Sequence, residues 1–155
     1  VDDPGLDHVL DLLRLDVQAL TRLRRADLVD DDGALKARVL RELAKRLLEN
    51  SWSILEYLVS SYSDRVYIGA GFAYNPAWMT LEEVAEIGDR IASIDPDLQV
   101  TVLDYFPAFR RRDIRRPTAS MMLEVKKVLE ERGLKTVIVQ TGIGHIGPGD
   151  RIVHY

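Results

Sequence analysis

The feature that most constrains the fold is an alternation of short apolar blocks with helix-like blocks in the second half of the chain. The blocks "RVYIGAG" (65–71), "LQVTVLDYF" (98–106) and "KTVIVQ" (135–140) are rich in β-branched and aromatic residues, which predicts buried strands. Strands joined by such long connections pair in parallel through right-handed crossovers, and their near-continuous apolarity predicts that both sheet faces are covered. The pattern therefore predicts an α/β fold.

Local signals mark the ends of the intervening helices. Thr80 with Glu83 three positions later forms a capping box, which opens a helix over "LEEVAEIGDRIASI". Pro117 and Thr118 begin the next helix, and Gly133 is suited to the left-handed cap at its end.

The first half of the chain is less regular. Residues 34–50 predict an amphipathic helix, which the pattern allows to continue through "SWSILEYL". By contrast, "LDLLRLDVQAL" (10–20) fits a helix face through its leucines, and it also fits a strand because apolar and charged residues alternate at its centre. Both interpretations stay open.

The length of 155 residues is typical of one domain. We therefore expect a single α/β domain over residues 1–155, with 65–148 as its recognisable βαβαβ part. Residues 1–64 are expected to be mainly helical, with a possible strand at 11–17.

The amino-acid composition excludes several kinds of site and disfavours some locations and partners for this protein. The chain has no cysteine, which excludes disulfides, thiolate metal sites and an iron–sulfur cluster held by its own thiols. No apolar run approaches the roughly 20 residues of a membrane span, and no leader pattern is present, so we expect a cytoplasmic protein without a membrane partner. The net charge of −4 disfavours nucleic acid as a partner. The two Asn and three Gln beside many Arg and Glu suggest a thermophile-like composition.

Three loops are expected to share the edge where the strands end: "AYNPAW" (73–78), "DYFPAFRRRDI" (104–114) and "TGIGHIGPGD" (141–150). Ligands of parallel α/β sheets bind at this edge. Each loop combines polar groups with aromatic residues or glycines, which is the composition of a ligand pocket.

The second of these loops is unusually cationic, with five arginines among residues 110–116. One interpretation is a solvated run that pairs with neighbouring Asp or Glu. The other is that one or two of Arg110, Arg111 and Arg112 point inward and clamp a carboxylate or phosphate. The sequence leaves both open.

Other polar residues at this edge are also open to two interpretations. The glycine-rich segment 141–149 suits either a flexible connector or a backbone cradle for an anion. His145 either is exposed or titrates near neutral pH beside a ligand. Asp104, and Asp16 if 11–17 is a strand, either bind a ligand or cap the following helix. No hydrolase triad, zinc motif or Walker loop accompanies them.

Residues 67–148 resemble the carboxyl-terminal part of radical S-adenosylmethionine proteins of the pyruvate formate-lyase activating-enzyme type. The resemblance rests on the order and spacing of "LEEVAEIGDRIASIDPD", a strand ending in "YFPAF" with basic residues after it, and "MLEVKKVLEERGLKTV". It implies parallel βα repeats that form part of a TIM-like partial barrel.

The resemblance also implies site residues. Those expected to face S-adenosylmethionine are Asp16, Gln18, Asn75 and Asp104, and those expected to face a small-molecule or peptide substrate are Tyr105, Arg110, Arg111, Arg112 and His145. Gln18 stands where the family often has Lys, and Phe106 stands where it often has His.

The largest departure from that family is the missing three-cysteine motif, without which this chain is not a competent radical enzyme on its own. We therefore expect either the cluster-less carboxyl-terminal half of such an enzyme, paired with a missing amino-terminal half or a second copy, or a truncated relative. The alternative is a non-catalytic module that docks a partner protein or itself, anchored by Trp78, Phe106 and Phe109.

Overall fold

The computed structural model describes residues 34–106 and 113–153 of the chain. It divides into two compact units, Val1–Leu58 and Val59–Tyr155, and each is considered by itself. The expectation of a single domain stays a prediction. The possible strand at 11–17 lies outside the described residues.

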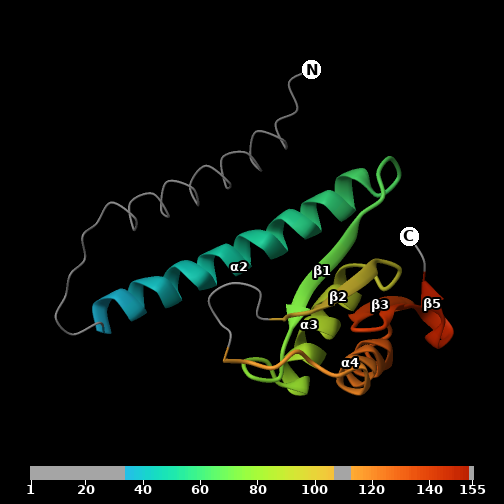
Figure 1. The fold of residues 1–155 in the computed structure, drawn as a ribbon. Coiled ribbons are helices and arrows are strands. Elements are labelled where there is room, and N and C mark those ends of the chain that lie inside the picture. Colours follow the sequence, from blue (N-terminus) through green and yellow to red (C-terminus); the bar gives the residue numbers. More distant parts are fainter. Residues whose placement is uncertain (1–33, 107–112, 154–155) are drawn as a thin grey trace. The chain divides into compact units, whose positions relative to one another are not determined.

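Helix α2 spans Ala34–Tyr62 (Figure 1), so the predicted helix at 34–50 is confirmed and does continue through 51–58. No glycine or proline interrupts these 29 residues, which favours one unbroken helix. Although α2 is long, neither it nor any other helix of the described residues is apolar enough to cross a membrane.

The described strands form one five-stranded sheet in the order β1-β2-β3-β4-β5. Their bounds are β1 Gly69–Tyr74, β2 Gln99–Asp104, β3 Thr136–Thr141, β4 Gly144–Ile146 and β5 Ile152–Val153. The pairs β1–β2 and β2–β3 are parallel, whereas β3–β4 and β4–β5 are antiparallel. The predicted α/β class and the parallel pairing of the first three strands are therefore confirmed.

The helices between these strands begin and end where the local signals predict. Helix α3 (Leu81–Ile94) has the capping box: Thr80 Oγ1 accepts from Glu83 N at 3.2 Å, and Thr80 N donates to Glu83 Oε2 at 2.7 Å. Helix α4 (Ala119–Glu131) has Thr118 as its N-cap. Gly133 follows it with φ of 93°, the left-handed conformation that glycine adopts without steric cost.

The core lies between one face of the sheet and helices α3 and α4, which pack against each other (Figure 1). Fully buried residues on this face of β2 and β3 are Val100, Val102, Val137 and Val139. Gly88 of α3 permits the close approach of the two helices, because a Cβ there would lie 3.1 Å from side-chain atoms of Leu129 and Arg132.

The prediction for the first strand is wrong in its bounds and its burial. The backbone N–H groups of Arg65 and Val66 donate to Tyr62 O, so the end of α2 takes up the start of the predicted strand. β1 is also an edge strand of the described sheet, and along it exposed residues alternate with partly buried ones up to the buried Tyr74. On β2, Leu103 is 45% exposed. The face opposite the helices is therefore not fully covered in the described part of the chain.

The glycine-rich segment is a hairpin, and the interpretation of 141–149 as a flexible connector is wrong. Strand β4 turns back along β3, and a short 3₁₀ turn, η1 (Pro148–Asp150), leads to β5. Gly147 N donates to Arg151 O at 2.8 Å, and Asp150 N donates to Gly147 O at 3.2 Å. These two N–H groups are not free for the anion cradle that was the other interpretation.

Candidate functional site at the carboxyl edge of the parallel strands

Three polar residues meet at the edge where the parallel strands end. Asn75 directly follows β1, Asp104 is the last residue of β2, and Thr141 is the last residue of β3. All three are buried, with exposures of 1%, 2% and 4%. Parallel pairing brings equivalent ends of strands to one edge, so the expectation that these three turns share an edge is confirmed.

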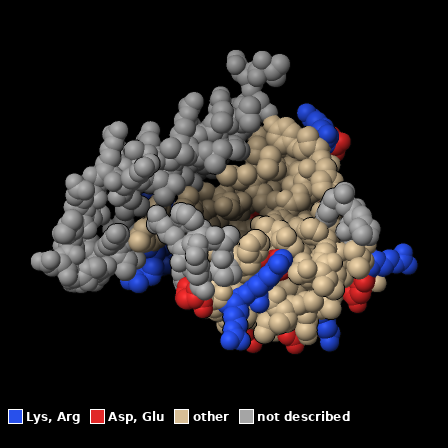
Figure 2. Space-filling view, in the orientation of Figure 1, with Lys and Arg blue, Asp and Glu red and all other residues tan. Residues whose placement is uncertain are grey.

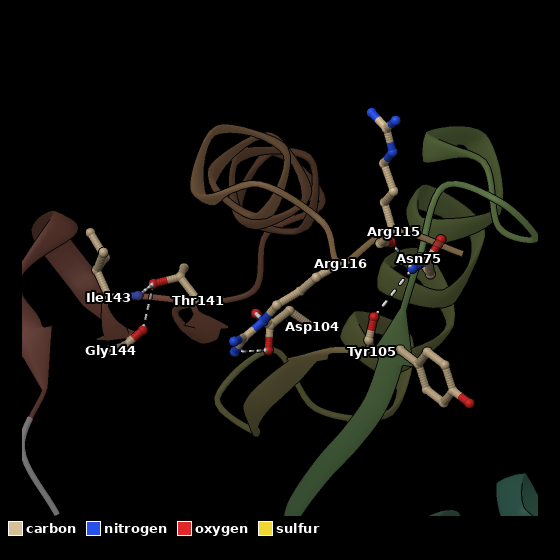
Figure 3. Close-up of polar contacts among 8 residues, drawn as sticks. All are labelled: Asn75, Asp104, Tyr105, Arg115, Arg116, Thr141, Ile143 and Gly144. Carbon is tan, nitrogen blue, oxygen red and sulfur yellow. Dashed lines mark hydrogen bonds and ion pairs between the residues drawn. The ribbon is translucent and has the colours of Figure 1, made fainter. Parts of the chain in front are cut away.

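Asp104 is held by an arginine from the loop before α4. Arg116 Nε donates to Asp104 Oδ2 at 2.6 Å and Nη2 donates to Oδ1 at 3.2 Å, a bidentate pair (Figure 3). The Asp104 side chain is completely buried, whereas that of Arg116 is 40% exposed. The hydrogen bonds that Arg116 donates to Asp104 raise the pKa of Arg116 above its usual value, so the guanidinium stays charged.

The guanidinium is fixed on a second side as well. Its central carbon lies 5.0 Å from the ring centroid of Phe106, a cation–π distance. Nη1 lies 3.9 Å from the position that a Cβ on Gly142 would occupy, and it has no hydrogen-bond acceptor among residues 34–106 and 113–153. Arg116 is thus a preorganised cation whose remaining N–H groups are available to an anionic ligand.

Asn75 organises the loops around this pair. Its Nδ2 donates to Tyr105 O at 3.2 Å and to Arg115 O at 2.9 Å, and its Oδ1 accepts from Ala77 N at 2.9 Å. Figure 3 shows the Arg115 side chain extending away from this contact. Because both amide hydrogens bind backbone carbonyls, only Oδ1 retains capacity for the expected cofactor contact, which stays a prediction.

Thr141 closes the hairpin beside Arg116. Its hydroxyl donates to Gly144 O at 2.7 Å and accepts from Ile143 N at 3.3 Å (Figure 3). The polar ends of all three parallel strands are therefore satisfied within the protein, which makes this edge rigid.

Aromatic side chains flank the edge. The rings of Trp78 and Tyr105 meet edge to face with centroids 4.7 Å apart. Trp78 is 43% exposed and Phe106 is 50% exposed, and Phe106 offers its apolar surface beside the guanidinium. Such a combination of aromatic groups and arginine is typical of binding sites for small ligands and for proteins.

Of the remaining predicted site residues, the structure describes His145. Asp16, Gln18, Arg110, Arg111 and Arg112 lie outside the described residues, as does Phe109, and their roles stay predictions. His145 is opposite Gln140 in the β3–β4 pair. Because side chains alternate along a strand, His145 is on the sheet face opposite that of Asp104.

Sequence reasoning missed Arg116 as the residue that meets Asp104. A signal existed in its position, because Arg116 is followed by Pro117 and the N-cap Thr118, where the chain must return to the sheet edge before α4 starts. A carboxylate predicted at the end of a buried strand also requires a cation or several donors nearby.

On the face drawn in Figure 2, the charged side chains of the described residues do not gather in a single patch. Figure 2 shows Lys and Arg side chains interspersed with Asp and Glu over the visible described surface. Among the described residues there is no cluster of three His, Asp or Glu side chains that could hold a metal ion.

Comparison of the chain with models of protein families, with curated proteins and with solved structures finds no match.

Proposed function

We propose that this protein is the cluster-less carboxyl-terminal half, or a truncated relative, of a radical S-adenosylmethionine activating-type enzyme, and that it binds a carboxylate-bearing ligand at the carboxyl edge of β1–β3. In this proposal the sheet is part of a TIM-like barrel, and its loops face S-adenosylmethionine and a small-molecule or peptide substrate. The single observation that carries the proposal is Arg116, oriented by buried Asp104 with N–H groups still open to a ligand.

The location of Arg116 supports a ligand role. In parallel α/β sheets, the strand ends and the loops that follow them form the ligand site. A solvated arginine must lose rotamer freedom when it binds, whereas the contacts with Asp104 and Phe106 have already ordered this one. A carboxylate that accepts from Nη1 therefore meets a donor whose orientation costs little.

The side chains of this protein fit the proposed ligand only in part. A [4Fe–4S] cluster needs cysteine thiolates, and the chain has none, so no radical step is assigned to it. The α-carboxylate of S-adenosylmethionine fits Arg116. In the proposal Asp16, Gln18 and the Asn75 Oδ1 atom would receive the remaining polar groups of the ligand.

The test is calorimetric titration of the 155-residue chain with S-adenosylmethionine. We expect binding, and we expect the double variant Asp104→Asn/Arg116→Gln to bind about 10- to 150-fold more weakly, because a charged hydrogen bond contributes about 1.5–3 kcal/mol. The double variant removes both charges, so it avoids leaving buried Asp104 unpaired. Circular dichroism verifies its fold.

Arg115→Gln is the matched control, because it removes an exposed arginine charge at the neighbouring position and keeps the carbonyl that Asn75 uses. We expect its affinity to equal that of the wild type. Replacing Arg110, Arg111 and Arg112 together by Gln is expected to leave this affinity unchanged, because these residues are predicted to face the substrate and not S-adenosylmethionine. Absence of S-adenosylmethionine binding, or equal loss in Arg115→Gln and the double variant, contradicts the proposal.

The second candidate function is a non-catalytic docking module. It is favoured by the exposure of Trp78 and Phe106 at the same edge, because aromatic residues beside arginine are frequent anchors of protein interfaces. The titration separates the two functions: the docking module predicts no heat with S-adenosylmethionine.

A further inference from the structure

The outer side of β1 has unused hydrogen-bonding groups. In the described sheet β1 pairs with β2 alone and is therefore an edge strand. Tyr105 N donates to Tyr74 O, which shows that the backbone groups of Tyr74 point towards β2. The N–H and C=O of one strand residue point to the same side, and this side alternates along the strand.

The alternation identifies the outward-facing residues. Ala70 and Phe72 share the inward direction of Tyr74, so the N–H and C=O groups of Gly69, Gly71 and Ala73 point away from β2. No hydrogen bond joins these outward groups to any residue of 34–106 and 113–153. They form a row of three donors and three acceptors.

This edge also lacks the features that prevent strand addition. The β1 sequence "GAGFAY" contains no charged residue and no proline, and its three outward-facing residues are glycine, glycine and alanine. Natural edge strands are usually protected by lysine, proline or a bulge. An unprotected edge of six residues is a surface on which another strand can pair.

We propose that β1 pairs antiparallel with β1 of a second copy of this chain, about a twofold axis that passes midway between the two Gly71 residues. The argument for a second copy is self-complementarity: Gly71 lies midway between Gly69 and Ala73, so in this register Gly71 meets Gly71 and Gly69 meets Ala73. Residues opposite each other in such pairs exchange both N–H···O bonds. Three donors from each copy then make six bonds, and every outward group is satisfied.

The side chains fit the same register. On the face covered by helices, Phe72 of one copy stands opposite Ala70 of the other, in a non-hydrogen-bonded pair where side chains are closest. Both residues are half-buried in the single chain and gain burial on pairing. A closed twofold pairing is also the commonest symmetry of oligomers. The inference does not depend on the proposed ligand site.

The first test is the association of the full chain, measured by sedimentation equilibrium up to about 200 µM, because so short an edge contact is expected to give a reversible dimer. Ala73→Pro removes one outward N–H and no bond to β2, and proline is tolerated at such edge positions. We expect its dissociation constant to rise at least tenfold. Ala73→Ser keeps the N–H and is expected to dimerise like the wild type.

The second test reads the register by cross-linking. The chain has no cysteine, so one introduced thiol reports one contact. In the proposed dimer the two Cα atoms at position 71 are about 5.5 Å apart, within disulfide range, whereas those at position 73 are about 14 Å apart. We expect Gly71→Cys to form a disulfide-linked dimer on mild oxidation and Ala73→Cys not to do so.

Several results of these two tests would contradict the proposed dimer. A wild type that stays monomeric at 200 µM contradicts the proposal. So does a dimer that tolerates Ala73→Pro, or one in which the two cysteine variants cross-link equally, because another surface or register would then hold it. Circular dichroism of each variant verifies that β1 and the sheet remain folded.

Discussion

Two buried charges in this protein are neutralised in opposite ways. At the carboxyl edge, the carboxylate of Asp104 is fully buried and its cation, Arg116, is 40% exposed. In α4, the ammonium of Lys126 is buried, with a side-chain exposure of 3%, and its partners Glu130 and Asp150 are 37% and 73% exposed. In each case the charge that has lost its water is bound by a charge that remains partly hydrated.

The difference between them lies in how replaceable the partners are. Asp104 depends on one guanidinium, and its short side chain at a strand end cannot reach solvent. Lys126 has two carboxylates, at 2.7 Å and 2.9 Å, and a long flexible stem. We therefore expect the Asp104 pair to be essential for stability and the Lys126 group to tolerate change.

The largest effect is expected for Arg116→Ala. It leaves Asp104 buried and unpaired, which costs about 3 kcal/mol, near the low end for buried pairs because Arg116 is itself partly hydrated. Urea unfolding measures the loss in free energy, and Arg115→Ala is the control with no expected loss. A cost below about 1 kcal/mol for Arg116→Ala would show that the Asp104 carboxylate reaches water in the variant.

A smaller effect is expected for Lys126→Met, which keeps an unbranched side chain in the same space. The carboxylates that lose their partner are exposed enough to be hydrated, so we expect a change within about 1 kcal/mol at pH 7. A loss as large as that of Arg116→Ala would remove the contrast between the two sites.

Lys126→Met also tests how the free energy of unfolding depends on pH. Burial opposes the charged form of Lys126, but hydrogen bonds to Glu130 and Asp150 outweigh it and raise the pKa above 10.5. The stabilisation is therefore complete below pH 10.5 and is lost as the pH rises through the folded-state pKa. Wild type should lose stability in that range more steeply than Lys126→Met. The raised pKa of Tyr74, due to burial and then Glu124, adds an alkaline loss common to both proteins.

The smallest effect is expected for Asp150→Asn, because Glu130 still binds Lys126 and the Asp150 side chain is 73% exposed. We expect a loss below about 1 kcal/mol, measured as a shift of the thermal midpoint. Glu131→Gln, which weakens the exposed pair with Lys127 at 3.8 Å, is the control with still less effect. An Asp150→Asn loss above 2 kcal/mol would show that η1 depends on this contact.

Sequence reasoning succeeded where a few neighbouring residues decide the structure. Thr80 and Glu83 start α3 through mutual hydrogen bonds three residues apart, and Gly133 ends α4 because it adopts a positive φ. The parallel order of β1–β3 followed from the length of the connections. From these elements alone the shared edge of Asn75, Asp104 and Thr141 was predictable.

Sequence reasoning failed where contacts between residues far apart in the chain decide the structure. The block "RVYIGAG" is apolar, yet its first residues complete the end of α2 and its last form an exposed edge. The glycines at 142, 144 and 147 indicated a loop, but the pairing of β4 with β3 makes Gly142 and Gly144 part of a hairpin, and Gly147 precedes η1. Sequence reasoning selected Arg110, Arg111 and Arg112 from the five arginines, whereas the path of the chain into α4 places Arg116 against Asp104.

The sequence by itself determined the α/β class, the helix ends and the meeting of three strand ends at one edge, because these depend on hydrophobic period, capping groups and connection length. Only the tertiary structure decided which charge is buried, which partner it binds and which strand lies at the edge of the described sheet. The reason is that burial and hydrogen-bond direction belong to contacts between segments far apart in the chain, and no local pattern encodes them.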